Sequence, residues 1–597
     1  MSISPATDSY QITKLFERDS LSPLDALKFN EANWAYLTDT NGNSYYDTIN
    51  FSTTILKQQL IDYHSAFLAI PLTVTRAALA TDKIGVAGED FINTRGLKQE
   101  YSPENYVTGL KTDETLICFR DSILNLIRGV QIQTDNGQTI VNENGYLDFI
   151  NNLRLKIEKN VDWSQTMSSL LHMSLDTAIV QSKFGSFANN MVSEFLPNAL
   201  ARGTDRDTQP SQAGQSFPAT STPAVGNNLA DPSYAVPNPC FNQGAWERVQ
   251  IFHNASKYDG GTGKRSTYDL VVKIPLRLIH DFFEQMDFPI INLGFNFTFY
   301  LRQPHTTDVT QFAPPDRNIP PLMVASQWGY ASSKPSIQTG GYPAIAYGKA
   351  VANSGYGTGC RLYFRSIKLD PISNQKLYAA LASADGLQKS FKFISTDYFT
   401  PSEGLTPDSG DKTYLISNSI VWPQRVWALL YTADLDGANG SSSAKSSGGA
   451  LGGDYNSNGT YGPQCGLQTV QGWMKNANIL VNNNPYFKSD LTTVDDFWNQ
   501  LKDQFPPNGS SLISYESFAR LFRYHCFDIS RLSDRLPSKT EPVSLQLKFD
   551  RADDSASASS GFKAGRCDLI VLIERVNQVQ MKFSNSDVQI VVGNITA

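Results

Sequence analysis

The chain lacks the cysteine clusters that metal centres, redox sites and disulfide scaffolds require. Its 597 residues include six cysteines, and no two of them have the short spacing of a metal-binding or redox motif. They stand far apart, at Cys118, Cys240, Cys360, Cys465, Cys526 and Cys567. A scaffold stapled by disulfides is thereby excluded, and we expect most of these residues to be buried free thiols.

Charge is also scarce. Charged residues make up 18% of the chain, below the level of about a quarter that is usual in globular proteins. The net charge is −7, and neither end carries an arm rich in Lys or Arg. Direct binding of nucleic acid needs clustered cations to neutralise phosphates, so we expect none here. A chain this poor in charge is typical of a protein that hides much of its surface in an assembly.

Long hydrophobic runs are missing as well. No stretch approaches the roughly 18 consecutive apolar residues of a membrane-spanning helix, so we expect no membrane span. The N-terminus does not show the basic and then apolar pattern of a signal peptide. We therefore expect a protein that is not secreted through a signal peptide.

The motifs of the common enzyme classes do not occur in the sequence. It has no HExxH pair, no GxSxG elbow and no phosphate-binding loop. His172 lies among apolar residues, and we expect it to be packed or on the surface rather than to bind a metal. We therefore predict no catalytic residue, no cofactor, no metal site and no enzymatic activity.

The strongest positive signal is a pattern that occurs twice, about 260 residues apart. Residues 268–301 and 524–550 each contain a strand-like stretch, a short segment with an Asp and a Pro, and an alternating strand. The alternating apolar positions are Leu293, Phe295, Phe297, Phe299 and Leu301 in the first copy, and Val543, Leu545, Leu547 and Phe549 in the second. A period of two predicts half-buried β-strands. The repeat favours two copies of one β-fold side by side.

The remaining pattern divides the chain into two such units. A chain of this length exceeds a single core, so two or three domains are expected. We predict an arm over 1–30, a first unit over 31–303, a linker and loop over 304–359, and a second unit over 360–597. Stretches rich in Gly, Ser, Pro and Asn at about 203–239 and 436–464 predict loop insertions in comparable places, one in each unit.

Helical patterns interrupt the strands in a few places. Apolar residues between Leu116 and Ile127 predict one helix. A second prediction covers Val494 to Phe505, where Thr493 and Asp496 have the spacing of a capping box and Pro506 ends the helix. Many short strands with few helices predict a mainly β protein of sandwich or barrel architecture.

Recognisable segments in the C-terminal half cover residues 478–487, 494–504, 514–518 and 527–536, and the closing strands 569–574 and 588–592. In the N-terminal half they cover residues 274–276 and 287–289 and the strand to Leu301. These segments resemble the major capsid proteins of virophages and polinton-like viruses, which contain a double jelly roll, and those of the N-terminal half look like the end of the first jelly roll.

The resemblance implies a specific fold and role. The fold would be mainly β, with two tandem antiparallel jelly-roll β-sandwiches and helical and long-loop insertions. The protein would form homotrimers, each a pseudo-hexameric capsomer that tiles an icosahedral shell around a DNA genome. Its partners would be neighbouring capsomers and minor capsid or penton proteins. It would be located in the virion after synthesis in the host cytoplasm or nucleus.

Two other functions remain open from the sequence. One is a β-sandwich virion protein of spike or penton type that binds a receptor or glycan, and the other is a β-sandwich carbohydrate enzyme. For the capsid function, aromatic residues in long loops are candidate intersubunit contacts. They are Phe217, Tyr234, Tyr330, Tyr342 and Tyr347, and the alternative is that they pack within their own loops.

Overall fold

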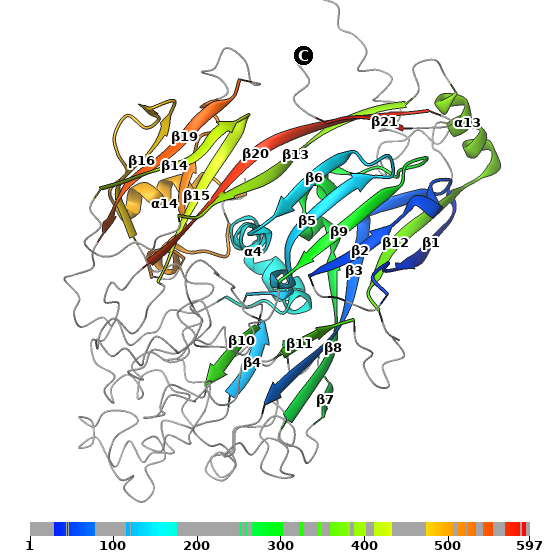
Figure 1. Ribbon diagram of the computed structural model, residues 1–597, viewed down its shortest axis with the longest axis horizontal. Helices are drawn as coiled ribbons and strands as arrows, with labels where there is room; N and C mark the ends of the chain where they lie inside the picture. Colours follow the sequence, from blue (N-terminus) through cyan, green and yellow to red (C-terminus); the bar gives the residue numbers. More distant parts are fainter. Residues whose placement is uncertain are drawn as a thin grey trace, which may run out of the picture.

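The structure is a computed structural model that describes most of the strands predicted from the sequence. The described residues are 29–77, 115–175, 248–302, 322–326, 344–348, 359–432, 473–552 and 567–592, with short gaps inside several of these ranges. Figure 1 shows two β-sandwiches, with α13 (Pro371–Leu381) between them in the chain. Most of the predicted arm, 1–28, lies outside the described residues, and the first strand begins at Phe29.

The first sandwich contains two main antiparallel sheets. One has the order β1 (Phe29–Thr38), β12 (Arg361–Leu369), β3 (Leu60–Ala77), β8 (Arg265–Pro275) and β7 (Lys257–Asp259), and β11 (Ala344–Tyr347) also pairs with β3. The other has the order β2 (Thr48–Ser52), β9 (Phe295–Leu301), β5 (Ile127–Thr134) and β6 (Thr139–Asn144). A separate small sheet pairs β4 (Thr115–Phe119) with β10 (Leu322–Ser326).

The second sandwich also contains two antiparallel sheets. One has the order β13 (Leu387–Phe399), β20 (Cys567–Phe583), β15 (Pro423–Thr432) and β18 (His525–Asp528), and β21 (Val588–Val592) pairs with β20. The other has the order β14 (Asp411–Ile420), β19 (Val543–Ala552), β16 (Trp473–Val481) and β17 (Asn484–Pro485).

The two sandwiches have the same strand order. When the eight main strands of each are counted along the chain, without β4, β7, β10 and β11 in the first and β21 in the second, both have sheets in the order 1-8-3-6 and 2-7-4-5. This is the order of a jelly roll, in which Greek-key connections wrap the strands into two facing sheets. The predicted fold class, a tandem pair of jelly rolls, is therefore confirmed.

The repeated sequence pattern corresponds to equivalent strands of the two jelly rolls. Its first copy spans β8 and β9, the sixth and seventh strands of the first unit, and its second copy spans β18 and β19, the sixth and seventh of the second. The apolar positions of both seventh strands are buried, as the period of two predicts. In the first unit, α10 (Leu276–Ile279) and α11 (Asp281–Gln285) lie between these strands.

Strand pairing corrects the predicted boundary between the units. We expected 304–359 to link them and the second unit to begin at 360. Instead, β12 pairs with both β1 and β3, and so supplies the eighth strand of the first jelly roll. Residues 304–359 therefore connect its seventh and eighth strands, and α13 follows as the connection to the second unit. Asp370 caps α13, since its Oδ1 accepts the Ser373 N–H at 2.6 Å.

The two predicted insertions, 203–239 and 436–464, lie outside the described residues. The strands around them show that they are not equivalent, because 203–239 falls between the fifth and sixth strands of its unit and 436–464 between the third and fourth. Successive strands of a jelly roll reverse direction, so these two connections and the one at 304–359 all leave from the corresponding end of a unit.

The helix predictions had mixed outcomes. Residues 494–502 form α14 with the predicted capping box, in which Thr493 Oγ1 accepts the Asp496 N–H at 3.2 Å and Asp496 accepts the Thr493 N–H at 2.8 Å. The helix predicted between Leu116 and Ile127 is wrong. That stretch forms β4, the short η2 (Ile123–Leu126) and the start of β5. The apolar residues that gave the helical spacing belong to two strands and a short turn.

We expect the two seventh strands to be equally sensitive to truncation of their inward side chains. Phe297→Ala should lower the free energy of unfolding by about 3–5 kcal/mol and Leu547→Ala by about 2–5 kcal/mol, because each leaves a cavity in its own core. The outward neighbours are matched controls, and Thr298→Ala and Gln546→Ala should each change it by about 0.5 kcal/mol or less. Chemical denaturation would measure all four, and equal losses on both faces would contradict the assigned register.

Candidate functional site

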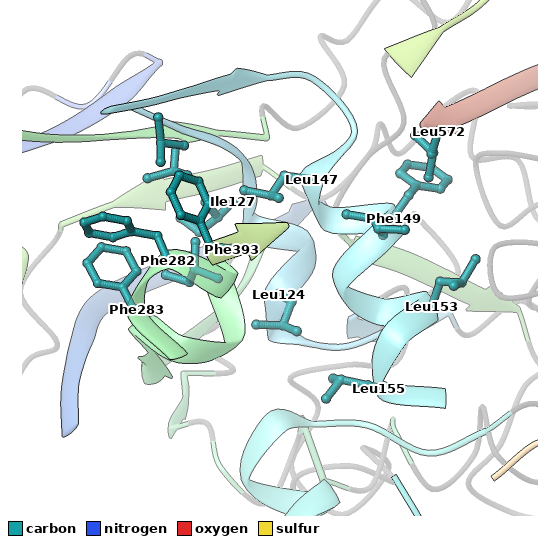
Figure 2. Packing of buried hydrophobic residues seen from close by; sticks show 14 of the residues in the cluster. Leu124, Ile127, Leu147, Phe149, Leu153, Leu155, Phe282, Phe283, Phe393 and Leu572 are labelled. Carbon is teal, nitrogen blue, oxygen red and sulfur yellow. The ribbon is translucent and has the colours of Figure 1, made fainter. Parts of the chain in front are cut away.

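The junction between the two jelly rolls has an aromatic centre. Phe282 of α11 lies 5.5 Å from Phe391 and 5.5 Å from Phe393 of β13, measured between ring centroids. Figure 2 shows Phe393 beside Phe282 and, at the other side of the cluster, Leu572 of the second unit near Phe149. Strands β13 and β20 are 13 and 17 residues long, so part of each reaches across to the first unit. Apolar burial thus joins the units directly.

A buried carboxylate crosses the same junction. Glu574 of β20 is 0% exposed, and its Oε1 accepts hydrogen bonds from Arg154 Nη2 at 2.6 Å and Nε at 2.8 Å. Its Oε2 lies 2.9 Å from Arg425 Nε and accepts the Trp427 Nε1–H at 3.1 Å. Arg154 belongs to α4 (Leu147–Glu158) of the first unit, whereas the other three residues belong to the second.

The arginines determine the charge state of this carboxylate. Burial by itself raises the pKa of Glu574, but Arg425 and Arg154 outweigh it and hold the pKa below the ordinary value. A buried ion is costly unless its partners satisfy it, and here both oxygens are bonded. The carboxylate therefore remains charged and fixes Arg154, and with it α4, against the second unit.

Glu143 of β6 makes a second polar link. Its Oε1 accepts hydrogen bonds from His280 Nε2 at 2.9 Å and from the Thr396 backbone N–H of the second unit at 2.9 Å. The Phe282 N–H donates to His280 Nδ1 at 3.0 Å, so the proton of the neutral ring lies on Nε2 and points to the carboxylate. Burial raises the pKa of Glu143, but His280 and the Thr396 N–H together bring it below the ordinary value.

A buried lysine makes a third polar link between the two jelly rolls. Lys156 of α4 is 1% exposed, and its Nζ donates to Asp121 Oδ2 at 2.5 Å and to the Tyr524 hydroxyl of the second unit at 3.2 Å. The Lys156 carbonyl accepts the Ser511 hydroxyl at 2.9 Å and the Leu512 N–H at 3.2 Å. Three charged groups at one junction fix its geometry more narrowly than apolar contact does, because hydrogen bonds are directional.

The predicted contact residues fall mostly outside the described part of the chain. This applies to Phe217, Tyr234, Tyr330 and Tyr342. Tyr347 is described, and the prediction that it faces another subunit is wrong. Its side chain is 6% exposed and its hydroxyl donates to the Arg302 carbonyl at 2.7 Å, so it packs within its own chain.

The described residues show an aromatic surface that the sequence analysis missed. Trp34 and Tyr36 of β1 are 55% and 50% exposed. They pack against Phe67 and Tyr363, whose rings stack at 4.8 Å and 9°, and the Arg361 guanidinium lies 4.7 Å from the Tyr36 ring. We call Trp34, Tyr36, Phe67 and Tyr363 the outer aromatic face. It could not be found from the sequence because its strands are up to 329 positions apart, from Trp34 to Tyr363.

His172 and His525 are both buried in the cores, and His172 packs with its ring centroid 5.2 Å from that of Phe119. Burial lowers the pKa of His172 to about 4 and that of His525 to about 3. His525 Nε2 accepts the Met474 N–H at 3.1 Å, which leaves the proton on Nδ1, facing the Ala428 carbonyl. Within the described ranges, no three His, Cys, Asp or Glu side chains are grouped as a metal site would need.

Comparison with solved structures identifies the architecture. A chain of the Sputnik virophage, from its 3.5 Å cryo-EM structure, aligns with a TM-score of 0.50 over 97% of this chain and 91% of that one, at 10% identity. The chain has the double-jelly-roll fold. The resemblance to virophage proteins is thereby confirmed at the level of the fold. The mavirus major capsid protein aligns over 100% of this chain and 96% of its own, at 10% identity and a TM-score of 0.43.

A third structure, PBCV-1 VP54 fitted into a reconstruction of Sputnik, aligns over 95% of this chain and 98% of its own, at 10% identity and a TM-score of 0.40. No protein-family model matches the sequence, and no curated protein matches it either. Among the helices of the described residues, none has both the length and the apolar character that a membrane span needs.

We expect Glu574→Gln to weaken the junction strongly. The variant leaves the partly buried Arg154 and Arg425 without their counter-ion at a fully buried position, which should lower the free energy of unfolding by about 3–5 kcal/mol. Asp397→Asn is the matched control, because its ion pair with Arg575 joins two half-exposed side chains and should contribute about 1 kcal/mol or less. Denaturant unfolding measures both, and equal effects would show that Glu574 does not anchor the junction.

The same carboxylates predict a dependence on pH. The folded-state pKa values of Glu574 and Glu143 lie below the ordinary 4.5, so their contribution is complete above that value and is lost as the pH falls through the folded values. The free energy of unfolding should therefore fall with acidification below about pH 4.5, and less steeply in Glu574→Gln. Denaturation between pH 7 and pH 3 would measure it. If the free energy of unfolding fell equally steeply with pH in both proteins, Glu574 would not be a cause of the dependence.

Proposed function

We propose that this protein is a viral major capsid protein. Three copies associate into a pseudo-hexameric capsomer, and capsomers tile an icosahedral shell that encloses a DNA genome. The observation that carries the proposal is the pair of jelly rolls with identical strand order, held at a fixed junction by Glu574 and Arg154. Three such chains supply six similar units, which is what a hexagonal tile requires.

The physical chemistry of the chain supports this function in two further ways. A closed ring of three needs a heterologous contact, in which one face of a copy meets a different face of the next. A rigid junction favours such a ring, because it fixes the angle between the two faces before association and so lowers the entropy lost. The low content of charged residues, 18%, suits a chain that buries much surface between copies.

The proposed partners follow from this role. They are two further copies in the homotrimer, neighbouring capsomers, and minor capsid or penton proteins at positions that the trimer leaves unfilled. The protein is proposed to reside in the virion and to contribute shape rather than catalysis. It is not proposed to bind nucleic acid directly, since no cluster of Lys and Arg occurs at either end of the sequence.

A second candidate function is binding of a glycan or receptor. The outer aromatic face favours it, because exposed aromatic rings flanked by a cation, here Tyr36 beside Arg361, offer a flat apolar surface with a polar edge. The capsid function is preferred because a glycan-binding module needs one jelly roll, whereas this chain fixes two in a defined arrangement. A β-sandwich carbohydrate enzyme has no comparable observation in its favour.

We expect the purified chain to form a stable trimer. Light scattering coupled to size-exclusion chromatography should give three times the chain mass of 66.0 kDa, about 198 kDa. Electron microscopy of that species should show a hexagonal block. A stable monomer would contradict the proposal. Glycan-array binding by that monomer, lost in Tyr36→Ala and kept in Ile55→Ala, would then support the second candidate.

A further inference from the structure

A wide groove lies along the side of the first jelly roll. Its volume is 940 Å³, near the top of the range of about 300–1,000 Å³ found for small-molecule sites. One wall is the outer surface of the sheet, with Trp34, Phe67 and Lys273. The other wall is formed by α5 (Val161–Met167) and η3 (Ser168–Leu171).

The groove exposes apolar side chains that a folded protein normally covers. Leu170 is 64% exposed and Met167 is 40% exposed, and both face the same space as Trp34, which is 55% exposed. Adjacent exposed apolar groups of this size mark binding sites. Charges of the lining nearly balance, since the cations Arg154, Lys159, Lys273 and Arg277 are accompanied by Glu158, Asp281 and Glu284. Apolar contact rather than net charge therefore selects the occupant.

A buried histidine lies in the wall of the groove. His172 lines the groove, is 7% exposed, and its Nδ1 has no hydrogen-bond partner among the described residues. Its backbone φ is 51°, a left-handed conformation that is uncommon outside glycine. An unpaired buried nitrogen costs free energy unless an occupant supplies a partner.

The chain carries a segment that fits this groove. Residues 1–28 precede β1, and their large apolar residues recur through the segment, at Met1, Ile3, Tyr10, Ile12, Leu15, Phe16, Leu21, Leu24 and Leu27. Strand β1 begins at Phe29, only five residues before Trp34 at the groove. A chain of 28 residues extends up to about 90 Å, so the groove of its own molecule and that of an adjacent copy are both within reach.

The register of the sheet brings the segment to the correct end of the groove. Phe29 pairs with Leu369 of β12, and two positions earlier on that strand Ile367 pairs with Leu60 of β3. Leu60 stands a few residues before His64 and Ser65, which line the groove. A tethered segment also has a high effective concentration, in the millimolar range for a short flexible connection. Weak apolar contacts are then sufficient to keep it bound.

We propose that residues 10–28 dock in this groove and cover Leu170, Met167 and Trp34. The segment is the occupant in preference to a folded surface of another protein, because a channel between a sheet and a short helical segment accepts an extended or helical peptide. The inference does not rest on the capsid function, since docking within one chain needs no shell.

Photo-crosslinking of the full chain tests the proposal. A benzophenone amino acid at position 170 should crosslink to peptides of residues 10–28, identified by mass spectrometry. The matched control is position 161, because Val161 is 55% exposed on the same helical segment but does not line the groove. Mixing isotope-labelled and unlabelled chains tells whether the segment comes from the same chain or another, and either result supports the proposal.

Substitutions in the segment sharpen the test without disturbing the core. Leu15→Asp together with Phe16→Asp should abolish the crosslink from position 170, whereas Thr13→Asp should retain it. Crosslinks from position 170 to residues 176–246, to another surface of a second copy, or to nothing would overturn the proposal. A chain that is monomeric but crosslinks as expected would overturn the capsid function alone.

Discussion

The arrangement of the whole molecule depends on one buried carboxylate. Glu574 sits in the second jelly roll with no exposure to solvent, and the first jelly roll reaches it through Arg154. Because a desolvated charge is tolerated only when it is fully bonded, the two units cannot separate or rotate without breaking the bonds between Arg154 and Glu574 Oε1. The aromatic contacts of Phe282 with β13 supply much of the apolar burial, and the ion cluster selects one geometry from those that such burial would allow.

The sequence predicted the fold well where its pattern was strictly periodic. The alternation from Leu293 to Leu301, and again from Val543 to Phe549, predicted buried seventh strands because a period of two has one structural explanation. The capping box at Thr493 predicted the start of α14 for a similarly local reason. The helix predicted between Leu116 and Ile127 was wrong, because residues 118, 119 and 121–127 are all buried, and a stretch buried on all sides has no distinctive period.

Features that depend on long-range pairing could not be predicted. The boundary at 360 was misplaced because β12 looks like the start of a new unit until its pairing with β1, more than 300 residues earlier, is known. The residues of the junction also lie far apart in the sequence. Arg154 and Glu574 are separated by 420 positions, and neither belongs to a motif. Of the predicted contact residues, Tyr347 proved buried, since an aromatic residue in a loop is equally suited to anchoring the loop against its own core.

The central claim is that the junction makes the two jelly rolls one rigid block. It is tested most directly by the distance distribution between two spin labels, attached through noncanonical residues at Ile55 of the first unit and Leu415 of the second, both exposed. Pulsed electron–electron double resonance on the intact chain should give one narrow distribution of distances between the labels. That distribution should broaden in Glu574→Gln. A broad distribution in the unmodified protein, or one unchanged in the variant, would contradict the account.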